Sequence, residues 1–509
     1  MEEVRPTRRE ALKIAAAAAG GAMLTSLGVS AIGTARSATS LGALARRLDG
    51  TLVVPGEPSY AAAAAVWNPR LSIRPRAIAF CRSIDDVRAV VGFASERGWP
   101  LSARSGRHSF EGYCNCSGIV ADVSQIDSIR VGSDRTSVTI GAGASNLQVF
   151  EQLVLGQGLG ISTGSCPSVG IAGLALGGGL SRGTRQRGML LDDLLEATVV
   201  LPNGRYVKTS AEHRPDLFWG LRGAGGGNFG VVTSLTFRTH ATPAVYEYAV
   251  TYPWSYAAQG MDQWQRFAPF APRELSSSTY FMTRAREPSG EYKLKATSGG
   301  LWYGSQADLE ALIEPLRPGA TAVDVKATSY VQAWKPDDCE VGPGNQVTCS
   351  TLPVYDAAYP NYQKSDYFNE FIPPKGLEAL VYRVAQWPGG PGAYEGGVHI
   401  EATGPTSRVN AIRPDSTSFV HRSSLYHCCY VNFWGQAQSQ PANVAWVDDI
   451  YSAMRPYASG QAYQNYIDGE LKNWRSAYYG SNWNRLRRVK RKYDPQNLLA
   501  FRQGITPAR

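Results

Sequence analysis

Two glycine-rich turns, residues 104–124 and 162–179, constrain this chain more than any other feature of its sequence. Glycine allows positive φ and lets backbone N–H groups approach a bound ligand closely, which is how phosphates and flat ring systems are held. His108 in the first turn and Cys166 in the second are the side chains that stand out chemically. Each turn alone also fits a surface loop with a satisfied His or a buried Cys, whereas the two together predict a cradle for a nucleotide.

The first turn reads Arg-Ser-Gly-Arg-His and ends at His108, and the second reads Gly-Ser-Cys-Pro-Ser-Val-Gly-Ile-Ala-Gly from Gly164 to Gly173. They resemble the R-S-G-G-H and G-x-C-x-x-V-G-x-x-G turns of the berberine bridge enzyme-like flavoproteins, a branch of the vanillyl-alcohol oxidase superfamily. The resemblance covers nearly the whole mature chain and implies FAD attached covalently to His108 and Cys166. The chain departs from the family at Arg107, where glycine is usual, so the turn must carry a side chain whose positive charge is expected near the FAD pyrophosphate.

A third glycine segment contains Gly225, Gly227 and Gly230, which satisfy G-x-G-x-x-G. A dinucleotide fingerprint opens a helix after a strand, whereas the residues that follow here, 231–238, are β-rich, so the context argues against NAD. In the resembled family this G-G-G-N-F-G-V-V segment closes the FAD domain against the adenine and pyrophosphate. The resemblance implies the following cofactor-binding residues: Arg104, Ser105, Gly106, Arg107, His108, Ser109, Gly164, Cys166, Val169, Gly170, Gly173, Gly177, Gly178, Gly225, Asn228, Phe229, Gly230, Val231, Val232 and Asn465.

The first forty residues read as a targeting segment. A twin-arginine pattern at residues 7–13 precedes a weakly hydrophobic Ala/Gly-rich run to about Ile32, with cleavage expected near residues 33–38. A permanent membrane anchor is the less favoured alternative, because such anchors are rich in Leu, Ile and Val. The pattern predicts a secreted protein, exported folded with its flavin by the twin-arginine route, without membrane association after cleavage.

The predicted fold is α+β, with a two-part FAD-binding domain of the vanillyl-alcohol oxidase type and a substrate domain whose antiparallel sheet roofs the flavin. Near residues 241–246 the glycine turns give way to strands richer in aromatic residues, and the boundary is placed there. The predicted division is a signal peptide at 1–38, an FAD-binding domain at 39–244, a substrate domain at 245–455 and a segment at 456–509 that returns to the FAD domain.

Local patterns predict individual elements. Ser83 starts a helix that Gly98 ends, and Asn146 is expected to cap another that runs to about residue 155. Pro-Asn-Gly at residues 202–204 predicts a hairpin. Within the substrate domain, four residues are interpreted as architecture before substrate contact: Gly396, Gly397, His421 and Arg422.

Composition limits the partners. The 509 residues are 43% hydrophobic and can bury a large core. The net charge of +9 is interpreted as scattered, and its densest run, residues 485–494, as the solvated basic face of a helix, so no nucleic-acid partner is expected. The six His are dispersed, and no metal is assigned. Eight Cys fit an oxidising compartment, and Cys339 and Cys349, on either side of a Gly/Pro turn, are the best disulfide candidate.

The catalytic candidate is Tyr466, the second Tyr of a Tyr-Gln-Asn-Tyr-Ile-Asp segment that resembles the family's Y-x-N-Y-x-D signature. The resemblance implies that it is the base that accepts a hydroxyl proton while hydride leaves the same carbon. A phenol titrates near pH ~10, so donors or positive charge must lower its pKa for this role. Val169, three residues after Cys166, looks like the valine of oxidases in the family, where leucine marks dehydrogenases that exclude oxygen.

Three hypotheses follow. The first is an oxidase that acts on a hydroxyl of a sugar, oligosaccharide or glycosylated natural product, a small-molecule substrate, and reduces O2 to H2O2. The second keeps the FAD but forms C–C bonds or oxidises amines on an alkaloid-like or polyketide scaffold. The third is a flavin-free binding or cell-wall protein that retains this fold, which the absence of flavin colour would reveal.

Overall fold

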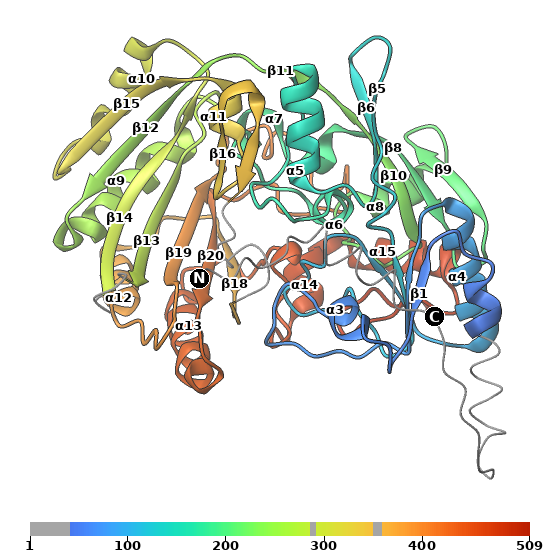
Figure 1. The fold of residues 1–509 in the computed structure, drawn as a ribbon. Helices are drawn as coiled ribbons and strands as arrows, with labels where there is room; N and C mark the ends of the chain where they lie inside the picture. The colour runs from blue at the N-terminus through green and yellow to red at the C-terminus, as the bar shows by residue number, and fades with distance from the viewer. Residues whose placement is uncertain (1–40, 286–291, 350–358) are drawn as a thin grey trace, which may run out of the picture.

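The computed structural model describes residues 41–285, 292–349 and 359–509 of the chain (Figure 1). The predicted leader, with its twin-arginine pattern, lies outside these residues. In the described part of the chain, no helix has the length and apolar character needed to cross a bilayer. Helices and strands alternate irregularly around three larger sheets, so the fold is α+β as predicted.

The first sheet delivers the chain into the His108 turn. Its inner pairs are parallel, with β2 and β3 both hydrogen-bonded to β4. Helix α4 (Ile84–Arg97) connects β2 to β3, and as predicted the Ser83 side chain accepts a backbone N–H at its start while Gly98 takes the left-handed conformation at its end. Across the sheet the strands are β1 (Thr51–Val53), β2 (Ala77–Phe80), β4 (Ile119–Asp122) and β3 (Leu101–Arg104).

The second sheet is antiparallel and has five strands. Across the sheet they are β5 (Ile129–Val131), β6 (Ser137–Gly141), β10 (Val231–Arg238), β8 (Leu194–Val200) and β9 (Tyr206–Ser210). Strands β8 and β9 pair directly, which confirms the hairpin predicted at residues 202–204. Strand β10 follows the third glycine segment without an intervening helix, which confirms that this segment is not a Rossmann fingerprint.

The third sheet has seven antiparallel strands. They are β15 (Ala322–Thr328), β12 (Val245–Tyr252), β14 (Tyr292–Trp302), β13 (Ser278–Ala285), β19 (Glu395–Ala402), β20 (Tyr426–Phe433) and β18 (Lys364–Phe368), in that order across the sheet. The helices α9 (Ala257–Phe267), α12 (Pro374–Ala385) and α13 (Gln440–Met454) pack on one face, where their apolar side chains share a buried cluster with those of the strands (Figure 1). The opposite face is therefore free to meet the glycine turns.

One local prediction is wrong in detail. The helix expected from Asn146 is present as α5 (Asn146–Val149), continued by a π-helical turn over Phe150–Leu155. Its cap, however, is Ser145, whose side chain accepts a backbone N–H at 3.2 Å. The Asn146 side chain is engaged elsewhere, because it donates to the carbonyl of Cys166 at 3.0 Å.

The C-terminal residues pack with the glycine-turn half. Leu486 and Val489 belong to the same buried cluster as the strands of the first two sheets. The other helices of this half are α3 (Tyr60–Ala64), α6 (Ile171–Gly177), α7 (Thr184–Arg187), α8 (Pro215–Leu221), α14 (Trp474–Tyr479) and α15 (Trp483–Tyr493). The remaining short elements are β7 (Leu159–Gly160), β11 (His240–Ala241), α10 (Gln306–Leu312), α11 (Tyr330–Trp334), β16 (Cys339–Val341) and β17 (Val347–Cys349).

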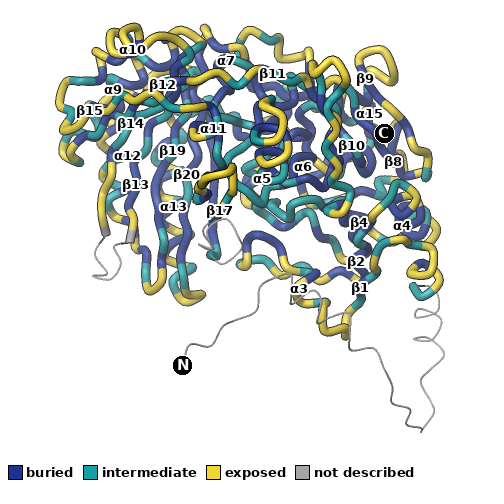
Figure 2. Tube along the Cα trace, turned by 45° about the horizontal axis from the view of Figure 1, so that its top comes forward, coloured by how far each residue is buried: buried dark blue, intermediate teal, exposed yellow. Residues whose placement is uncertain are grey.

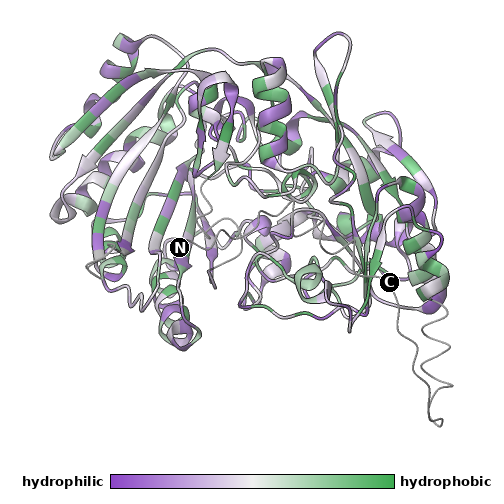
Figure 3. Ribbon diagram, viewed as in Figure 1, coloured by the Kyte–Doolittle hydropathy of each residue, from purple (hydrophilic) through white to green (hydrophobic). Residues whose placement is uncertain are grey.

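The distribution of buried residues shows two packed halves. In Figure 2 buried segments run through the strands of both halves, and the exposed segments lie mostly at helix surfaces and loop ends. The helices in Figure 3 carry both hydrophobic and hydrophilic positions, as expected of helices that cover a sheet on one side and face solvent on the other. The disulfide predicted between Cys339 and Cys349 is confirmed and joins β16 to β17.

Candidate active site

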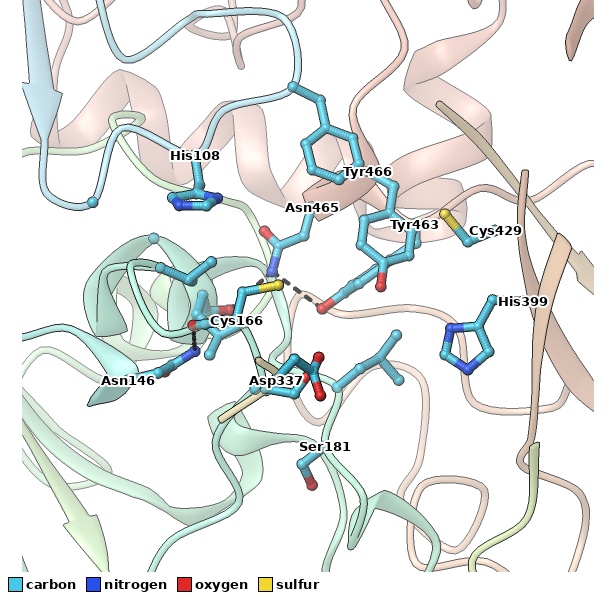
Figure 4. A pocket seen from close by; sticks show the side chains of 18 of the residues that line it. His108, Asn146, Cys166, Ser181, Asp337, His399, Cys429, Tyr463, Asn465 and Tyr466 are labelled. Carbon is cyan, nitrogen blue, oxygen red and sulfur yellow. Dashed lines mark hydrogen bonds between the residues drawn. The ribbon is translucent and has the colours of Figure 1, made fainter. Parts of the chain in front are cut away.

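A cavity of about 1220 Å³ lies between the glycine turns and the free face of the seven-stranded sheet. Figure 4 shows His108 and Cys166 on one side of it, His399 and Cys429 on the other, and Tyr466 between them. The residues predicted from sequence that line it are Arg104, Ser105, Gly106, Arg107, His108, Ser109, Gly164, Cys166, Val169, Gly170, Gly173, Gly225, Gly230, Val232, Asn465 and Tyr466. The structure therefore brings both turns and the C-terminal Tyr together.

Five predicted residues lie behind the cavity wall: Gly177, Gly178, Asn228, Phe229 and Val231. A Cβ on Gly177 would stand 1.9 Å from the Asn465 side chain, so glycine is needed there for the close approach of that segment. The buried Asn228 side chain donates to the carbonyl of Ala224 at 2.9 Å and accepts the backbone N–H of Ile505 at 2.9 Å. These residues shape the wall and hold the C-terminal segment in place.

The two glycine-rich turns that carry His108 and Cys166 pack closely against each other. A Cβ added to Gly106 would stand 2.1 Å from the backbone N of Gly170, and one added to Gly170 would stand 2.1 Å from the Ser105 hydroxyl. Only glycine permits this approach, which places residues 58 positions apart in the sequence, at 108 and 166, on one cavity. The glycine spacing recognised in the sequence thus has a packing cause.

His108 is a neutral imidazole in this site. Its Nε2 shares a hydrogen bond of 2.8 Å with the Ser168 hydroxyl, and its ring stacks on Trp67 with centroids 5.0 Å apart. Burial lowers the pKa of His108 to about 3, because the charged form would lose its hydration. A neutral ring keeps a nitrogen lone pair available at ordinary pH.

Cys166 lies in a turn that is held from two directions. Its carbonyl accepts from Asn146, and the carbonyl of Ser165 accepts the backbone N–H of Asp337 at 2.9 Å. Burial raises the pKa of the Cys166 thiol, and the carboxylates of Asp337 and Asp338 raise it further. Cys166 is therefore a protonated thiol in this site. His108, in contrast, is a neutral imidazole with a nitrogen lone pair available.

Arg107, the departure from the family pattern, has a left-handed backbone with φ of 65°. Its guanidinium donates to the carbonyl of Ala62 at 3.1 Å and lies 3.9 Å from the Asp122 carboxylate. Asp122 also holds the buried Arg104 at 2.6 Å. The positive charge of Arg107 is thus directed at a buried carboxylate, and these contacts offset the backbone strain of a side chain where glycine would fit.

Tyr466 ends a 3₁₀ turn over Gln464–Tyr466 and is held by aromatic contacts. Its ring lies parallel to that of Phe110, 5.3 Å away, and edge-on to Tyr463 at 5.0 Å. Burial raises the pKa of Tyr466 well above its ordinary value, and Glu401 is among the neighbours that raise it further. The expectation that donors or positive charge lower this pKa is wrong for the cavity, because burial and the neighbouring thiols, phenol and carboxylate all raise it.

The sheet supplies polar groups that the sequence analysis missed. Register places Tyr280, His399 and Cys429 side by side across β13, β19 and β20, with Glu401 two residues beyond His399 on the same face. His399 Nε2 lies 3.3 Å from Glu401, and its ring stacks on Tyr280 at 4.3 Å. Burial raises the pKa of Glu401 to about 7, although 21% of its side chain faces the open cavity.

A signal for these residues was present in the sequence. Within β19, Val398 and Ile400 are buried in the core, and the polar residues that alternate with them, 399 and 401, must point to the other face. The residues interpreted as architecture behave differently, since none of them lines the cavity. Arg422 forms a buried ion pair of 2.7 Å with Asp192.

The comparisons with known proteins agree with this geometry. Residues 75–210 match the FAD binding domain model, and residues 462–506 match the model described as berberine and berberine like. The chain is 30% identical over 465 residues to the chitooligosaccharide oxidase of Gibberella zeae, covering 89% of this chain and 91% of that protein. It is 26% identical over 439 residues to the tetrahydroberberine oxidase of Berberis wilsoniae, covering 81% of each.

The structure of BBE-like 1 from Physcomitrella patens superposes with a TM-score of 0.81 at 27% identity, covering 92% of this chain and 99% of that one. The chain belongs to the berberine bridge enzyme-like family. It is an FAD-dependent oxidase of the vanillyl-alcohol oxidase superfamily, and the hypothesis of a flavin-free binding protein is wrong.

The cavity of this berberine bridge enzyme-like protein fits FAD. Gly173, Gly226 and Gly227 line it, and a Cβ added to any of them would meet no protein atom within 4 Å. Bare backbone thus faces open space, where a ring or a phosphate can lie against it. The volume of about 1220 Å³ exceeds the roughly 300–1,000 Å³ of ordinary ligand pockets, which leaves room for a dinucleotide and a substrate together.

Proposed function

We propose that this protein is a secreted oxidase with FAD attached to both His108 and Cys166. It oxidises a hydroxyl group of a sugar, oligosaccharide or glycosylated natural product and reduces O2 to H2O2. The observation that carries the proposal is the single cavity that joins both attachment residues to Tyr466 and to the polar face of the sheet. The likeness to chitooligosaccharide oxidase supports the substrate class.

The two attachment residues would hold the isoalloxazine ring between them. Ser168 occupies Nε2 of His108, which leaves Nδ1 as the nitrogen for a bond to the cofactor. Bound FAD would supply a hydride acceptor at N5. With the flavin attached to the two turns, the space beneath the sheet would be left for the substrate. The hydroxyl-bearing carbon of the substrate must approach the hydride acceptor of the flavin, and its hydroxyl group must approach a proton acceptor of the protein.

Tyr466 and Glu401 would move the hydroxyl proton together. Since burial makes a phenolate of Tyr466 costly, the phenol can accept the substrate proton efficiently only if it passes its own proton on. The carboxylate of Glu401, with its pKa near 7, suits the final acceptor at neutral pH. The neutral ring of His399 lies beside that carboxylate, with Nε2 3.3 Å from it.

Oxygen access and export belong to the same proposal. Val169 lines the cavity three residues after Cys166. Its short side chain would leave room for O2 beside the bound flavin. The twin-arginine leader at residues 1–38 would export the loaded protein, leaving an FAD domain at 39–244, a substrate domain at 245–455 and a returning segment at 456–509.

Oxidative C–C bond formation or amine oxidation is the alternative reaction, supported by the likeness to tetrahydroberberine oxidase.

An anaerobic screen tests the function directly. Purified yellow protein is mixed without oxygen with mono- and oligosaccharides, simple alcohols and alkaloids, and loss of flavin colour is recorded. Bleaching by carbohydrates, followed by stoichiometric H2O2 when air is admitted, is the expected result. Bleaching by alkaloids alone would establish the alternative.

A further inference from the structure

The net charge of the protein resides in its C-terminal tail. Residues 472–509 contain ten Lys and Arg and one carboxylate, a net charge of +9, whereas residues 1–471 contain 41 basic and 41 acidic side chains. The whole excess of +9 therefore comes from 38 residues. The interpretation of the charge as scattered through the sequence is wrong.

The tail presents much of this charge to solvent. Lys472 precedes α14, and Arg488 and Arg491 lie on α15; all three are exposed, and within the described ranges none of their side chains forms a hydrogen bond or an ion pair. Arg485, three residues before Arg488, lies on the same stripe of the helix and stacks 3.8 Å over Trp219. Such a stripe creates a positive electrostatic potential at the surface, which attracts a polyanion.

A surface hollow of about 320 Å³ opens where α15 begins. It is lined by Lys472, Asn473, Arg475, Ser476, Gly480 and Trp483. The Arg475 guanidinium lies 4.7 Å from the ring centre of Trp474 and 5.8 Å from that of Trp483. An indole, an amide, a hydroxyl and two cations thus converge on one hollow, none of whose residues lines the cofactor cavity.

We propose that the hollow and the arginine stripe of α15 form a binding site for an acidic polysaccharide. One face of the Trp483 ring stacks on Tyr479, with centroids 5.7 Å apart. The part of the indole that lines the hollow suits the apolar face of a sugar ring, and Asn473 and Ser476 suit its hydroxyl groups. Lys472 and the exposed arginines pair with the acidic groups of successive sugars. At 1.5 Å per residue, the stripe carries cations to about 12 Å from Trp483, which is enough for several charged units.

The surface chemistry favours a glycan over a membrane. Stable binding to a bilayer surface combines basic residues with apolar side chains that enter the acyl boundary. The exposed large hydrophobic residues of the described chain are Leu195, Tyr206, Phe270, Leu294, Phe371 and Tyr382, none of which belongs to the tail. The tail therefore offers charge and hydrogen bonds without an apolar anchor.

Affinity electrophoresis of the flavin-loaded protein in gels that contain polygalacturonate tests the charge contribution. We expect the triple variant R475Q/R488Q/R491Q to bind about tenfold more weakly than the wild type, since three exposed charge pairs are lost. The matched control R46Q/R47Q/R130Q removes three exposed arginines elsewhere and should bind within about twofold of the wild type. Equal weakening in both variants would show that only net charge matters and would overturn the site.

A second set of probes tests the class of ligand. Polyacrylate carries the carboxylates without sugar rings, and pullulan carries sugar rings without charge. We expect Asn473→Ala and Trp483→Ala to weaken binding to polygalacturonate and to leave binding to polyacrylate unchanged, with melting temperature checked for each variant. Binding to polyacrylate, phosphatidylglycerol vesicles or duplex DNA as tightly as to polygalacturonate would overturn the assignment to polysaccharide.

Discussion

The two walls of the cavity are built by different rules. On the glycine-turn side, Ser105 and His108 lie within four residues, and Cys166 and Gly170 within five, so each group sits on one continuous turn. On the sheet side, Tyr280, His399 and Cys429 come from three strands and meet only because register aligns them. A motif search finds the first kind of site, whereas the second kind exists only once the strands are paired.

The largest effect is expected when both proposed attachment residues are removed from the glycine-turn wall. His108→Ala and Cys166→Ala, made singly, should each keep covalent flavin through the other bond. The double variant should release all flavin on acid denaturation, because both proposed attachment residues are gone. Colour in the acid-precipitated protein measures this. Covalent flavin in the double variant would show that another side chain is attached.

The next test concerns the residue between the walls. Tyr466→Phe keeps the ring that stacks on Phe110 and removes the hydroxyl, so folding and flavin content should not change. Turnover should fall about 100-fold or more, as expected for loss of a general base. Stopped-flow reduction under anaerobic conditions separates this step from reoxidation. Near-normal reduction in the Phe variant would assign the proton to another group.

The sheet wall is tested by Glu401→Gln, which we expect to slow reduction about thirtyfold. Because burial raises the pKa of Glu401 to about 7 and the ionised form accepts the proton, the rate should rise as pH climbs through about 7 and level off above it. The Gln variant should lose this rise. Glu247→Gln, which neutralises a cavity carboxylate paired with Lys326, is the matched control and should keep it.

The smallest expected effect comes from adding one methylene group to each wall of the cavity in turn and measuring reoxidation. Val169→Leu should slow reoxidation by air about tenfold, since the added group fills space needed by O2, and should leave anaerobic reduction intact. Val431→Leu adds the same group on the sheet side and should leave reoxidation unchanged. If both variants, or neither, reoxidise slowly, Val169 does not control oxygen access.

Features that depend on neighbouring residues could be predicted from the sequence. The helix between Ser83 and Gly98, the hairpin at residues 202–204 and the disulfide between Cys339 and Cys349 are present as expected. Each is specified by turn or cap chemistry within a short segment. The prediction that Asn146 caps its helix failed because a distant carbonyl, that of Cys166, engages its side chain.

By itself, the sequence determined the family, the α+β class and the two turns that meet at the cofactor cavity, because glycine spacing encodes a backbone conformation locally. Alternation with the buried Val398 and Ile400 puts His399 and Glu401 on one face of their strand, but only the tertiary structure decided that this face lines the cavity, through strand pairing. The tertiary structure also decided where the charge of Arg107 is directed and whether Tyr466 is protonated. The guanidinium of Arg107 turns to Asp122, and burial keeps Tyr466 protonated. The energy of a charge depends on every group around it, and those neighbours are gathered from the whole chain by folding.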